Sequence, residues 1–416
     1  MKRTHISYSL DRTCLIPLIA IALLSLILLL FVGQNKSSPS TGISSNQQNL
    51  DLLDKNLYDP SQLPRLPRFA YLISGTKGDV SRVKRLLQAV YHPRNCYLLH
   101  LDFEASDDER LELAKYVKVE SGVIREFGNV MVLGKGDLVT YKGPTMIASI
   151  LHGVAILLKQ FEDWDWFVNL SAEDYPLMPQ DDILHVFSYL ARDLNFLEHT
   201  SGIGWKEYQR AKPIIVDPGL YHAKKSGVFW AKEKRHLPAA FKLFMGSDLV
   251  VLTRSFLEFC VWGWDNLPRT VLMYYTNFVS STEGYFHTVI CNQKDYQNTT
   301  VNHDLHYLKW DNPPKQYPLN LTLEHFEDMV ASGAPFARKF AKDDPVLNKI
   351  DKELLGRSDG QLARGGWCAG ESVLGKDPCV VYGSPHAVKP TVSSKRLEKL
   401  MVELLDSEKF RSKQCK

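Results

Sequence analysis

The sequence lacks a strong excess of charge of either sign. Its 416 residues include 50 basic and 47 acidic side chains, a formal net charge of +3, and no basic tract is interleaved with aromatic residues. Proteins that bind nucleic acid usually carry a larger positive charge, so the composition does not indicate one. With 44% hydrophobic and 23% charged residues, the chain has the composition of a globular protein with room for a large core.

The sequence also lacks cysteines spaced for a metal site. No pair among its seven cysteines has such spacing beside histidines. Six of them follow the N-terminal apolar run, namely Cys96, Cys260, Cys291, Cys368, Cys379 and Cys415. An even number in an oxidising compartment predicts disulfide bonds, but the spacing does not give their connectivity.

Charge is absent altogether from the run "CLIPLIAIALLSLILLLFV", Cys14–Val32. As a helix it extends about 28 Å, enough to cross the hydrocarbon core of a bilayer. The alternative, a cleaved signal peptide, has a shorter apolar region and a small-residue cleavage site. Lys2, Arg3 and Arg12 precede the run, so the positive-inside rule predicts a type II single-pass protein with a cytosolic N-terminus.

The chain is therefore expected to have four parts. They are a cytosolic tail over 1–13, a transmembrane signal-anchor over 14–32, a flexible lumenal stem over 33–65 and a catalytic domain over 66–416. In the lumen, the sequons at Asn298 and Asn320 lie in polar stretches and are expected to be glycosylated. A third sequon at Asn169 lies in an apolar run and is expected to be buried and unmodified.

From Phe69 onward, short apolar runs alternate with helical patterns. Strands are expected at 69–74, 96–102, 129–133 and 166–170, and helices at 80–91, 108–117 and 145–161. This order predicts an α/β fold, with a parallel sheet covered by helices on both faces. Ligands of such sheets bind outside the carboxyl ends of the strands, so we expect the site at that edge.

Three loops at this edge carry candidate residues. "SGTKGD" contains Ser74 and Gly75, whose small side chains would let a nucleotide approach, but it is neither G-x-G-x-x-G nor a P-loop and also fits an ordinary turn. Asp102 ends the second strand, where a carboxylate can bond a ribose hydroxyl or cap a helix. Glu173 and Asp174 follow the fourth strand in "SAEDYP".

The stretch "DWDW" invites a metal interpretation. Asp163 and Asp165 have the D-x-D form that many nucleotide-sugar transferases use to hold Mn²⁺ or Mg²⁺, but they precede the fourth strand and so lie at the wrong edge. Glu173 and Asp174 at the correct edge are adjacent rather than D-x-D, and we expect no metal. On a strand these two would point to opposite faces, which also argues against the paired carboxylates of a hydrolase.

A single glutamate precedes the apolar helical pattern in "NFVSSTEGYFHTVICN", Asn277–Asn292. Ser280 and Glu283 have the spacing of a capping box, in which Glu283 would only mark the start of a helix. The alternative is a catalytic carboxylate. The residues alone leave both interpretations open.

Five blocks together resemble a known family. "RLLQAVYHPRNCYLLHLD", "WFVNLSAEDYPL", "LFMGSDLVVLTRSFLEF", "SSTEGYFHTVI" and "HYLKWDNP" occur in the order seen in glycosyltransferase family 14, which includes the animal core-2/I-branching β-1,6-N-acetylglucosaminyltransferases. The chain looks most similar to the plant branch, the β-glucuronosyltransferases acting on arabinogalactan proteins. The resemblance covers about Arg68 to the C-terminus.

The resemblance implies a GT-A-like fold, a Golgi location and metal-independent inversion at the sugar. UDP-glucuronate would be the donor and β-galactan the acceptor. Glu283 corresponds to the catalytic base, and Lys339, with Arg338 beside it, to the lysine that neutralises the departing diphosphate. The arginine partner of that lysine is missing from "LEHFED", and Arg364 is the candidate replacement. Without the family, Arg338 and Lys339 would be a solvated basic face.

On the acceptor side, the residues are matched through the family alone. Glu198, Lys206 and Arg210 resemble acceptor-site residues, and Trp310 a tryptophan near the acceptor, with core packing as its alternative. Glu173 and Asp174 are assigned to the same region. The family's tyrosine in the Trp310 block is Asn312 here, so the contacts differ. The donor carboxylate needs a cation, for which Lys206, Arg210 and Arg364 are candidates.

Two other function classes stay in view. One is a transferase of N-acetylglucosamine or another UDP-sugar, and the other is a non-catalytic lumenal protein that binds carbohydrate. UDP binding would separate the enzyme from the binder. A homo-oligomer or a complex with other Golgi transferases is left open.

Overall fold

The computed structural model describes residues 64–416, apart from 201, 222–226, 316, 372–376 and 416. The predicted tail and signal-anchor, and all of the predicted stem but its last two residues, lie outside the described residues. Among the residues described, no helix has both the length and the apolar character needed to cross a bilayer.

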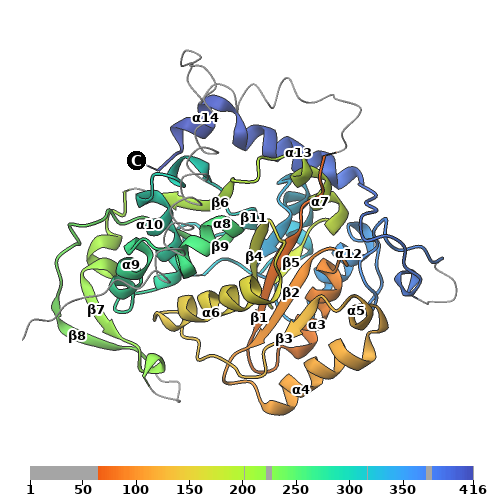
Figure 1. Cartoon of the computed structure of the whole chain (residues 1–416), viewed down its shortest axis with the longest axis horizontal. Helices are drawn as coiled ribbons and strands as arrows, with labels where there is room; N and C mark the ends of the chain where they lie inside the picture. The colour runs from red at the N-terminus through yellow and green to blue at the C-terminus, as the bar shows by residue number, and fades with distance from the viewer. Residues whose placement is uncertain (1–63, 201, 222–226, 316, 372–376, 416) are drawn as a thin grey trace, which may run out of the picture. The chain divides into compact units, whose positions relative to one another are not determined.

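A seven-stranded sheet forms the centre of the described chain (Figure 1), in the order β10-β6-β9-β4-β1-β2-β3. The strands are β1 (Phe69–Gly75), β2 (Cys96–Leu101), β3 (Val130–Val132), β4 (Trp166–Ser171), β6 (Asn195–Thr200), β9 (Met245–Thr253) and β10 (Thr300–Val301). The four strands expected from the sequence are confirmed, each to within one residue at either end.

The expectation of a wholly parallel sheet is wrong. Strands β1 to β4 pair in parallel, but β9 runs antiparallel to both β4 and β6. The reason lies in the connection between β6 and β9. The chain leaves β6 at the carboxyl edge, stays at that edge, and re-enters the sheet there as β9, so β9 must run the other way. Residues 202–221 and 227–244 therefore lie at the edge where ligands are expected.

Helices cover both faces of the sheet, as predicted (Figure 1). The helices on one face are α3 (Val80–Val90), α4 (Asp107–Lys115), α5 (Gly122–Phe127), α7 (Gln180–Ser188), α12 (Pro345–Glu353) and α13 (Val392–Leu405). Those on the other face are α6 (Thr145–Gln160), α8 (Arg254–Trp262), α9 (Leu267–Tyr275) and α10 (Tyr285–Asn292). Alternate residues of β1 enter the two cores, with Tyr71 and Ile73 on the first face and Ala70 and Leu72 on the second.

Two smaller sheets and several short turns complete the fold. One sheet has the order β11-β12-β5 and the other is the pair β7-β8, drawn at the left of Figure 1. Their bounds are β5 (Asp174–Pro176), β7 (Pro213–Val216), β8 (Phe229–Lys234), β11 (His306–Leu308) and β12 (Phe336–Arg338). Short helical turns are η2 (Tyr116–Glu120), η3 (Glu207–Ala211), η4 (Pro218–Leu220), η5 (Ser281–Glu283), η6 (Gln297–Thr299), η7 (Leu323–His325) and η8 (Pro378–Val380), and short helices are α11 (Phe326–Ala331) and α14 (Ser407–Ser412).

The three sequons differ in exposure as predicted. Asn298 and Asn320 are exposed, so an oligosaccharide would meet no packing there. Asn169 is buried within β4, where its amide donates to the Asp248 carbonyl and accepts from the Val250 N–H. Asn169 therefore joins β4 to the antiparallel strand β9. Modification at Asn298 and Asn320 stays a prediction.

Candidate active site

A cleft of about 210 Å³ opens at the carboxyl ends of β1, β2 and β4. Four of the residues predicted on the nucleotide side line it, namely Ser74, Gly75, Asp102 and Arg338. The sequence rule that placed ligands at this edge therefore leads to the cleft.

Asp102 is held at the bottom of this cleft by its neighbours. Its carboxylate accepts from the Thr76 hydroxyl at 3.0 Å and from the Glu104 N–H at 3.1 Å, which ties the loop after β1 to the loop after β2. It does not cap α4, because that role belongs to Ser106, which forms a capping box with Glu109. Asp102 is thus a cleft residue rather than a helix cap, and its bond to a ribose hydroxyl stays a prediction.

The packing of helix α3 requires a glycine at position 75, which the sequence did not suggest. A Cβ at Gly75 would lie 2.8 Å from Cγ2 of Val83 on α3. The lack of a side chain lets α3 pack closely on β1. Gly75 lines the cleft as well, but its packing against α3 already accounts for the glycine.

The small sheet brings a second group of charged residues to the mouth of the cleft. Because β12 pairs antiparallel with β5, Arg338 lies opposite Asp174. The Arg338 guanidinium is 3.4 Å from the Asp174 carboxylate and 3.6 Å from that of Asp248. Burial opposes the charge on Arg338, but Asp174, Asp248 and Glu173 outweigh it and raise the pKa of the guanidinium. Arg338 is therefore a permanent, mostly buried cation and not part of a solvated basic face.

Two acceptor assignments need correction at this point. Asp174 is buried and its carboxylate accepts from the Ser171 N–H, so it cannot reach an acceptor sugar. Glu173 lines the cleft at the nucleotide side instead of an acceptor surface, and its carboxylate lies 3.6 Å from the ammonium of Lys339. The Lys339 ammonium also lies 5.6 Å from the ring centre of Tyr317. Glu173 and Asp174 thus orient the two basic residues predicted to face the diphosphate.

Glu283 lies beside this group and is almost completely buried. One oxygen of its carboxylate accepts from the Tyr141 hydroxyl at 2.6 Å, and the other forms an ion pair with Arg210. The Tyr141 hydroxyl and the Arg210 guanidinium thus hold the two carboxylate oxygens of Glu283 in a defined position. The role of Glu283 as a general base stays a prediction.

The capping box expected at Glu283 is wrong. Helix α10 begins two residues later, and neither Ser280 nor Gly284 makes a side-chain cap bond. Ser280 adopts the left-handed region, with φ of 57°, an uncommon and strained conformation for a residue other than glycine. The Ser280 N–H bonds to the carbonyl of Lys142, which brings the loop carrying Tyr141 against Glu283.

Tyr141 was not predicted as a site residue from the sequence. It lies in the loop after β3, a fourth loop at the carboxyl edge, so the rule used for the other three loops would have included it. Burial raises the pKa of Tyr141 well above its ordinary value, and the negative charges of Glu283 and Asp248 raise it further. The phenol therefore stays protonated and donates to Glu283. Its ring also lies 6.3 Å from that of Tyr317, which links Glu283 to the Lys339 side of the cleft.

We expect Tyr141→Phe to lower kcat about tenfold or more, because Glu283 loses a hydrogen bond to a charged group worth about 1.5–3 kcal/mol. The ring contact with Tyr317 is kept, so UDP affinity and the melting temperature should change little. Steady-state kinetics with UDP titration test this. Tyr189→Phe, at an exposed tyrosine after α7, is the matched control. Equal kcat values for Tyr141→Phe and wild type would contradict the contact.

The remaining predicted acceptor residues lie near the same edge. Glu198 is on β6 and Lys206 immediately precedes η3, and their charges act on each other. Loss of water around the Glu198 carboxylate raises its pKa, as does Asp304, whereas Lys206 lowers it. Trp310 is 45% exposed, so the alternative of core packing is wrong.

Arg364 does not reach the cleft. The N–H of the preceding residue, Ala363, bonds to the Gln88 carbonyl in the last turn of α3. Because α3 starts beside Gly75 at the carboxyl edge, its last turn lies at the opposite edge. The role assigned to Arg364, a phosphate contact in place of the missing family arginine, is therefore wrong.

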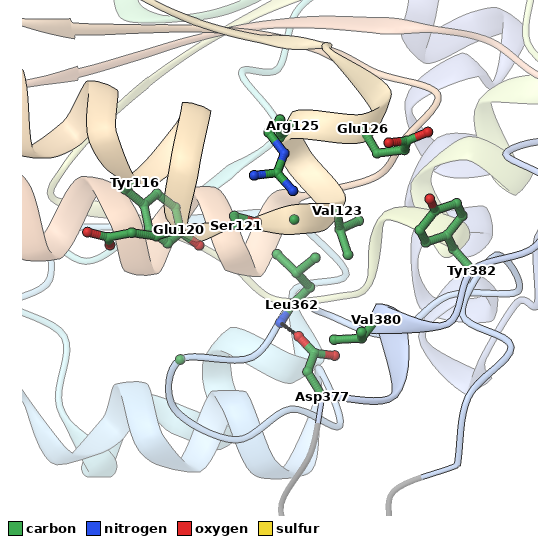
Figure 2. A pocket seen from close by; sticks show the side chains of 12 residues that line it. Tyr116, Glu120, Ser121, Val123, Arg125, Glu126, Leu362, Asp377, Val380 and Tyr382 are labelled. Carbon is green, nitrogen blue, oxygen red and sulfur yellow. Dashed lines mark hydrogen bonds between the residues drawn. The ribbon is translucent and has the colours of Figure 1, made fainter.

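A larger groove, of about 440 Å³, lies away from the cleft and from Glu283. Figure 2 shows it between α5 and η2 on one side and the segment of Leu362, Asp377 and Val380 on the other. Because α5 leads into the amino end of β3, the groove lies toward the edge opposite the cleft. None of the residues predicted for the site lines it.

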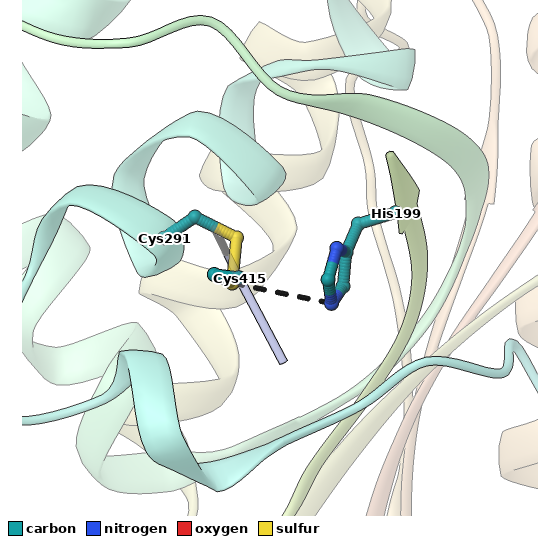
Figure 3. A group of neighbouring side chains, drawn as sticks. All are labelled: His199, Cys291 and Cys415. Carbon is teal, nitrogen blue, oxygen red and sulfur yellow. Dashed lines mark hydrogen bonds between the residues drawn. A yellow bond between two sulfur atoms is a disulfide. The ribbon is translucent and has the colours of Figure 1, made fainter. Parts of the chain in front are cut away.

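The D-x-D pair lies at the amino end of β4, as predicted. Asp165 accepts from the Arg68 N–H and Asp163 pairs with the Arg68 side chain, so both stabilise the start of the sheet. One other group has metal-like composition, His199 with Cys291 and Cys415 (Figure 3). Its two sulfurs are joined in a disulfide, so neither is a thiolate that could bind a metal.

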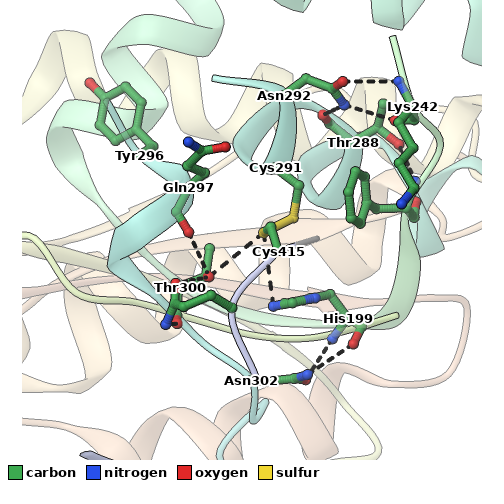
Figure 4. The surroundings of a disulfide bond; sticks show 12 residues. His199, Lys242, Thr288, Cys291, Asn292, Tyr296, Gln297, Thr300, Asn302 and Cys415 are labelled. Atoms are coloured by element: carbon green, nitrogen blue, oxygen red, sulfur yellow. Dashed lines mark hydrogen bonds between the residues drawn. A yellow bond between two sulfur atoms is a disulfide. The ribbon is translucent and has the colours of Figure 1, made fainter. Parts of the chain in front are cut away.

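Four of the six cysteines that follow the N-terminal apolar run form disulfides. Cys291 bonds to Cys415, and Cys368 to Cys379, whereas Cys96 and Cys260 are buried and unbonded. Figure 4 shows the first bond attaching the C-terminal segment to α10, the helix that follows Glu283.

We expect Cys415→Ala to lower the free energy of unfolding by about 2–4 kcal/mol, because the bond it removes joins residues 124 apart and restrains the unfolded chain. Thermal unfolding followed by circular dichroism tests this. Cys260→Ala is the matched control, since it removes a buried cysteine that has no disulfide. Equal melting temperatures for Cys415→Ala and wild type would contradict the prediction.

A cleft at the carboxyl edge of an α/β sheet, with a buried carboxylate beside it, has the position at which enzymes of this fold class bind their ligands. The family model "Branch: Core-2/I-Branching enzyme" matches residues 69–330. This chain belongs to the core-2/I-branching enzyme family, as the resemblance in its sequence indicated.

Individual relatives agree with this membership. The chain is 63% identical to "Beta-glucuronosyltransferase GlcAT14C" of Arabidopsis thaliana over 416 residues, covering the whole of both chains. It is 54% identical to "Beta-glucuronosyltransferase GlcAT14B" of the same plant, over 98% of this chain and 96% of the relative. "Xylosyltransferase 2" of Canis lupus familiaris is 30% identical over 59% of this chain and 27% of its own length.

Proposed function

We propose that this chain is an inverting β-glucuronosyltransferase with a GT-A-like fold that transfers glucuronate from UDP-glucuronate to the β-galactan of arabinogalactan proteins. The 63% identity to GlcAT14C over the full length supports the donor and the reaction. The structural observation that supports the proposal is the position of Glu283, which lies between Tyr141 and Arg210 and beside the cleft. A protein that only binds carbohydrate needs no buried base there.

The proposed reaction is a single displacement at the anomeric carbon. The acceptor hydroxyl gives its proton to Glu283 as its oxygen bonds to that carbon, and the bond from the carbon to the diphosphate oxygen breaks on the opposite side. UDP leaves with the electron pair. Lys339 and Arg338 lie at the mouth of the cleft and would face the charge that develops on it. Of the cations considered for the donor carboxylate, Lys206 is the candidate kept here, since Arg210 already pairs with Glu283.

Location and partners are part of the same proposal. The charge-free run Cys14–Val32 supports a single-pass type II protein of the Golgi membrane, with the catalytic domain in the lumen. The alternatives are another UDP-sugar as donor and assembly into a homo-oligomer or with other Golgi transferases.

The deciding experiment is a donor panel. The full-length protein, purified in detergent, is incubated with a β-galactan oligosaccharide and UDP-glucuronate, UDP-N-acetylglucosamine, UDP-xylose or UDP-galactose, with and without EDTA. We expect glucuronate to be transferred in a β-linkage, and transfer to survive EDTA. If only another sugar were transferred, the UDP form of that sugar would be the donor in place of UDP-glucuronate. If UDP bound but no sugar were transferred from any donor, the result would favour a protein that only binds carbohydrate.

For the diphosphate clamp, we expect Lys339→Ala to weaken UDP binding about 10–100-fold, because it removes a charge-assisted contact. Isothermal titration with UDP measures the change. Lys349→Ala on α12, which removes a lysine of similar exposure away from the cleft, is the control. Unchanged UDP affinity in Lys339→Ala would remove Lys339 from the site.

A further inference from the structure

The two partners of Glu283 lie at different ends of its carboxylate. Tyr141 donates to Oε1 and belongs to the β3–α6 loop, whose Val139 lines the donor cleft. Arg210 pairs with Oε2 and belongs to η3, which contributes no residue to the lining of that cleft. The Tyr141 end therefore faces the donor, and the Arg210 end faces away from it.

An acceptor must approach from the end away from the donor. Inversion requires the attacking hydroxyl to stand opposite the leaving diphosphate, so the rest of an acceptor chain extends past Arg210. The segment it would meet is the one that stays at the carboxyl edge between β6 and β9. Its β7 strand is fastened close to Glu283, since the Ile215 N–H bonds to the Asn277 carbonyl and the Asn277 amide donates back to Ile215.

This segment is unusually rich in exposed aromatic side chains. Five of the twelve exposed aromatic residues in the described part of the chain lie within it: Trp205, Tyr208, Tyr221, Phe229 and Trp230. Trp205 and Tyr208 are each 62% exposed and lie within five residues of Arg210. Contiguous exposed apolar surface on a soluble domain usually marks a binding site.

The chemistry of these side chains favours a neutral oligosaccharide. Aromatic rings present flat apolar faces against which the C–H faces of β-linked galactose can pack, while their edges leave sugar hydroxyls in water. The acidic and basic side chains of the turn are already engaged with each other, since Lys212 pairs with Glu207 at 2.8 Å and lies 4.1 Å from the Tyr208 ring centre. Around η3 the surface therefore presents the exposed rings of Trp205 and Tyr208 beside a charge pair that is already formed.

We propose that Trp205 and Tyr208 form a distal acceptor subsite, which binds galactose residues of the acceptor chain beyond the one that is glycosylated. The occupant is the acceptor glycan, because the surface is continuous through η3 with Arg210 and the base. This subsite rests on the proposed transferase function and extends it, since it makes the enzyme selective for long acceptors. The β7-β8 pair, with Phe229 and Trp230, would extend the same surface.

The test compares a galactose disaccharide with a long β-galactan oligosaccharide as acceptors for the full-length protein. In the wild type we expect kcat/KM to be about tenfold higher for the long acceptor, since each ring contact adds a modest binding energy. In the double variant Trp205→Ala, Tyr208→Ala, that ratio should fall to about one. Trp264→Ala is the matched control, because Trp264 is fully exposed in the connection between α8 and α9 and lies outside the segment. It should keep the wild-type ratio.

Three outcomes would overturn the subsite. One is an unchanged ratio in the double variant, and another is an equal loss of kcat/KM for both acceptors, which would indicate damage to the Arg210 turn. The third is a double variant in which only the molar mass measured by light scattering changes. That result would indicate that the surface is an interface between two copies of this chain. The ratio is measured with whichever UDP-sugar is transferred, so a wrong donor leaves this test intact. If no donor is transferred, isothermal titration of the long oligosaccharide decides, and affinity that is equal in the double variant and wild type refutes the subsite.

Discussion

Replacing Glu283 by Gln should lower kcat by about 10²–10⁴-fold while leaving UDP affinity almost unchanged. Glutamine has nearly the same size and still accepts a hydrogen bond from Tyr141, but it cannot take a proton from the acceptor hydroxyl. Steady-state kinetics on the full-length protein, together with UDP titration, separate the loss of chemistry from a loss of binding.

The change should cost little stability. Arg210 loses its charged partner, but its side chain is 22% exposed and can be solvated. The matched control is Glu207→Gln, which neutralises a carboxylate on the same turn as Arg210 that pairs with Lys212. Its kcat should stay within about twofold of wild type. If Glu283→Gln turned over within a few-fold of wild type, Glu283 would not be the base.

The backbone around Glu283 explains why this carboxylate is held so firmly. Ser280 occupies the left-handed region, and Gly284 packs so closely that a Cβ there would lie 2.4 Å from the Tyr275 hydroxyl oxygen. The Ser281 hydroxyl donates to the carbonyls of Tyr275 and Phe278, which closes the turn on α9. Strain of this kind persists where surrounding contacts impose it, and it is common at functional sites.

The donor side of the site was predictable because it depends on local order. Ser74, Gly75 and Asp102 lie at the carboxyl ends of short apolar strands, and parallel strands bring these ends to one edge whatever the rest of the chain does. The same reasoning placed Asp163 and Asp165 at the other edge, where the structure has them. Hydrophobic patterning alone was enough for these positions.

The contacts of Glu283 were not predictable from patterning. Its partners Tyr141 and Arg210 are 142 and 73 residues away in the chain, and nothing in the local sequence of Glu283 specifies either. The Ser280–Glu283 spacing even favoured a capping box, because spacing cannot reveal that Ser280 has a positive φ. The β3–α6 loop brings Tyr141 to Glu283 on η5, and the η3 turn brings Arg210.

Sheet register explains the error at Asp174 and the buried position of Arg338. Asp174 was considered for a ligand because it follows a strand at the edge where ligands are expected, and Arg338 was matched to the phosphate side through the family. The antiparallel pairing of β5 with β12 instead sets them opposite each other, in a pairing between residues 164 positions apart that no local pattern encodes.

This buried pair leads to the second large effect. Arg338→Met should lower the free energy of unfolding by about 3–5 kcal/mol, because it leaves the Asp174 carboxylate buried without its cation. The Asp174 side chain is 0% exposed, and the Arg338 guanidinium is 3.4 Å away. Methionine keeps most of the arginine's apolar volume, so the loss would reflect charge rather than packing. Chemical denaturation of the variant and wild type measures it.

Two further variants make the measurement specific to the buried charge. Lys339→Met removes the neighbouring cation, but Lys339 and its partner Glu173 are about one-third exposed, so the cost should stay below about 1 kcal/mol. Adding Asp174→Asn to Arg338→Met removes the uncompensated charge while its amide oxygen still accepts from the Ser171 N–H. This double variant should recover a large part of the lost stability. A loss for Arg338→Met no greater than that for Lys339→Met would show that the Asp174 charge does not depend on Arg338.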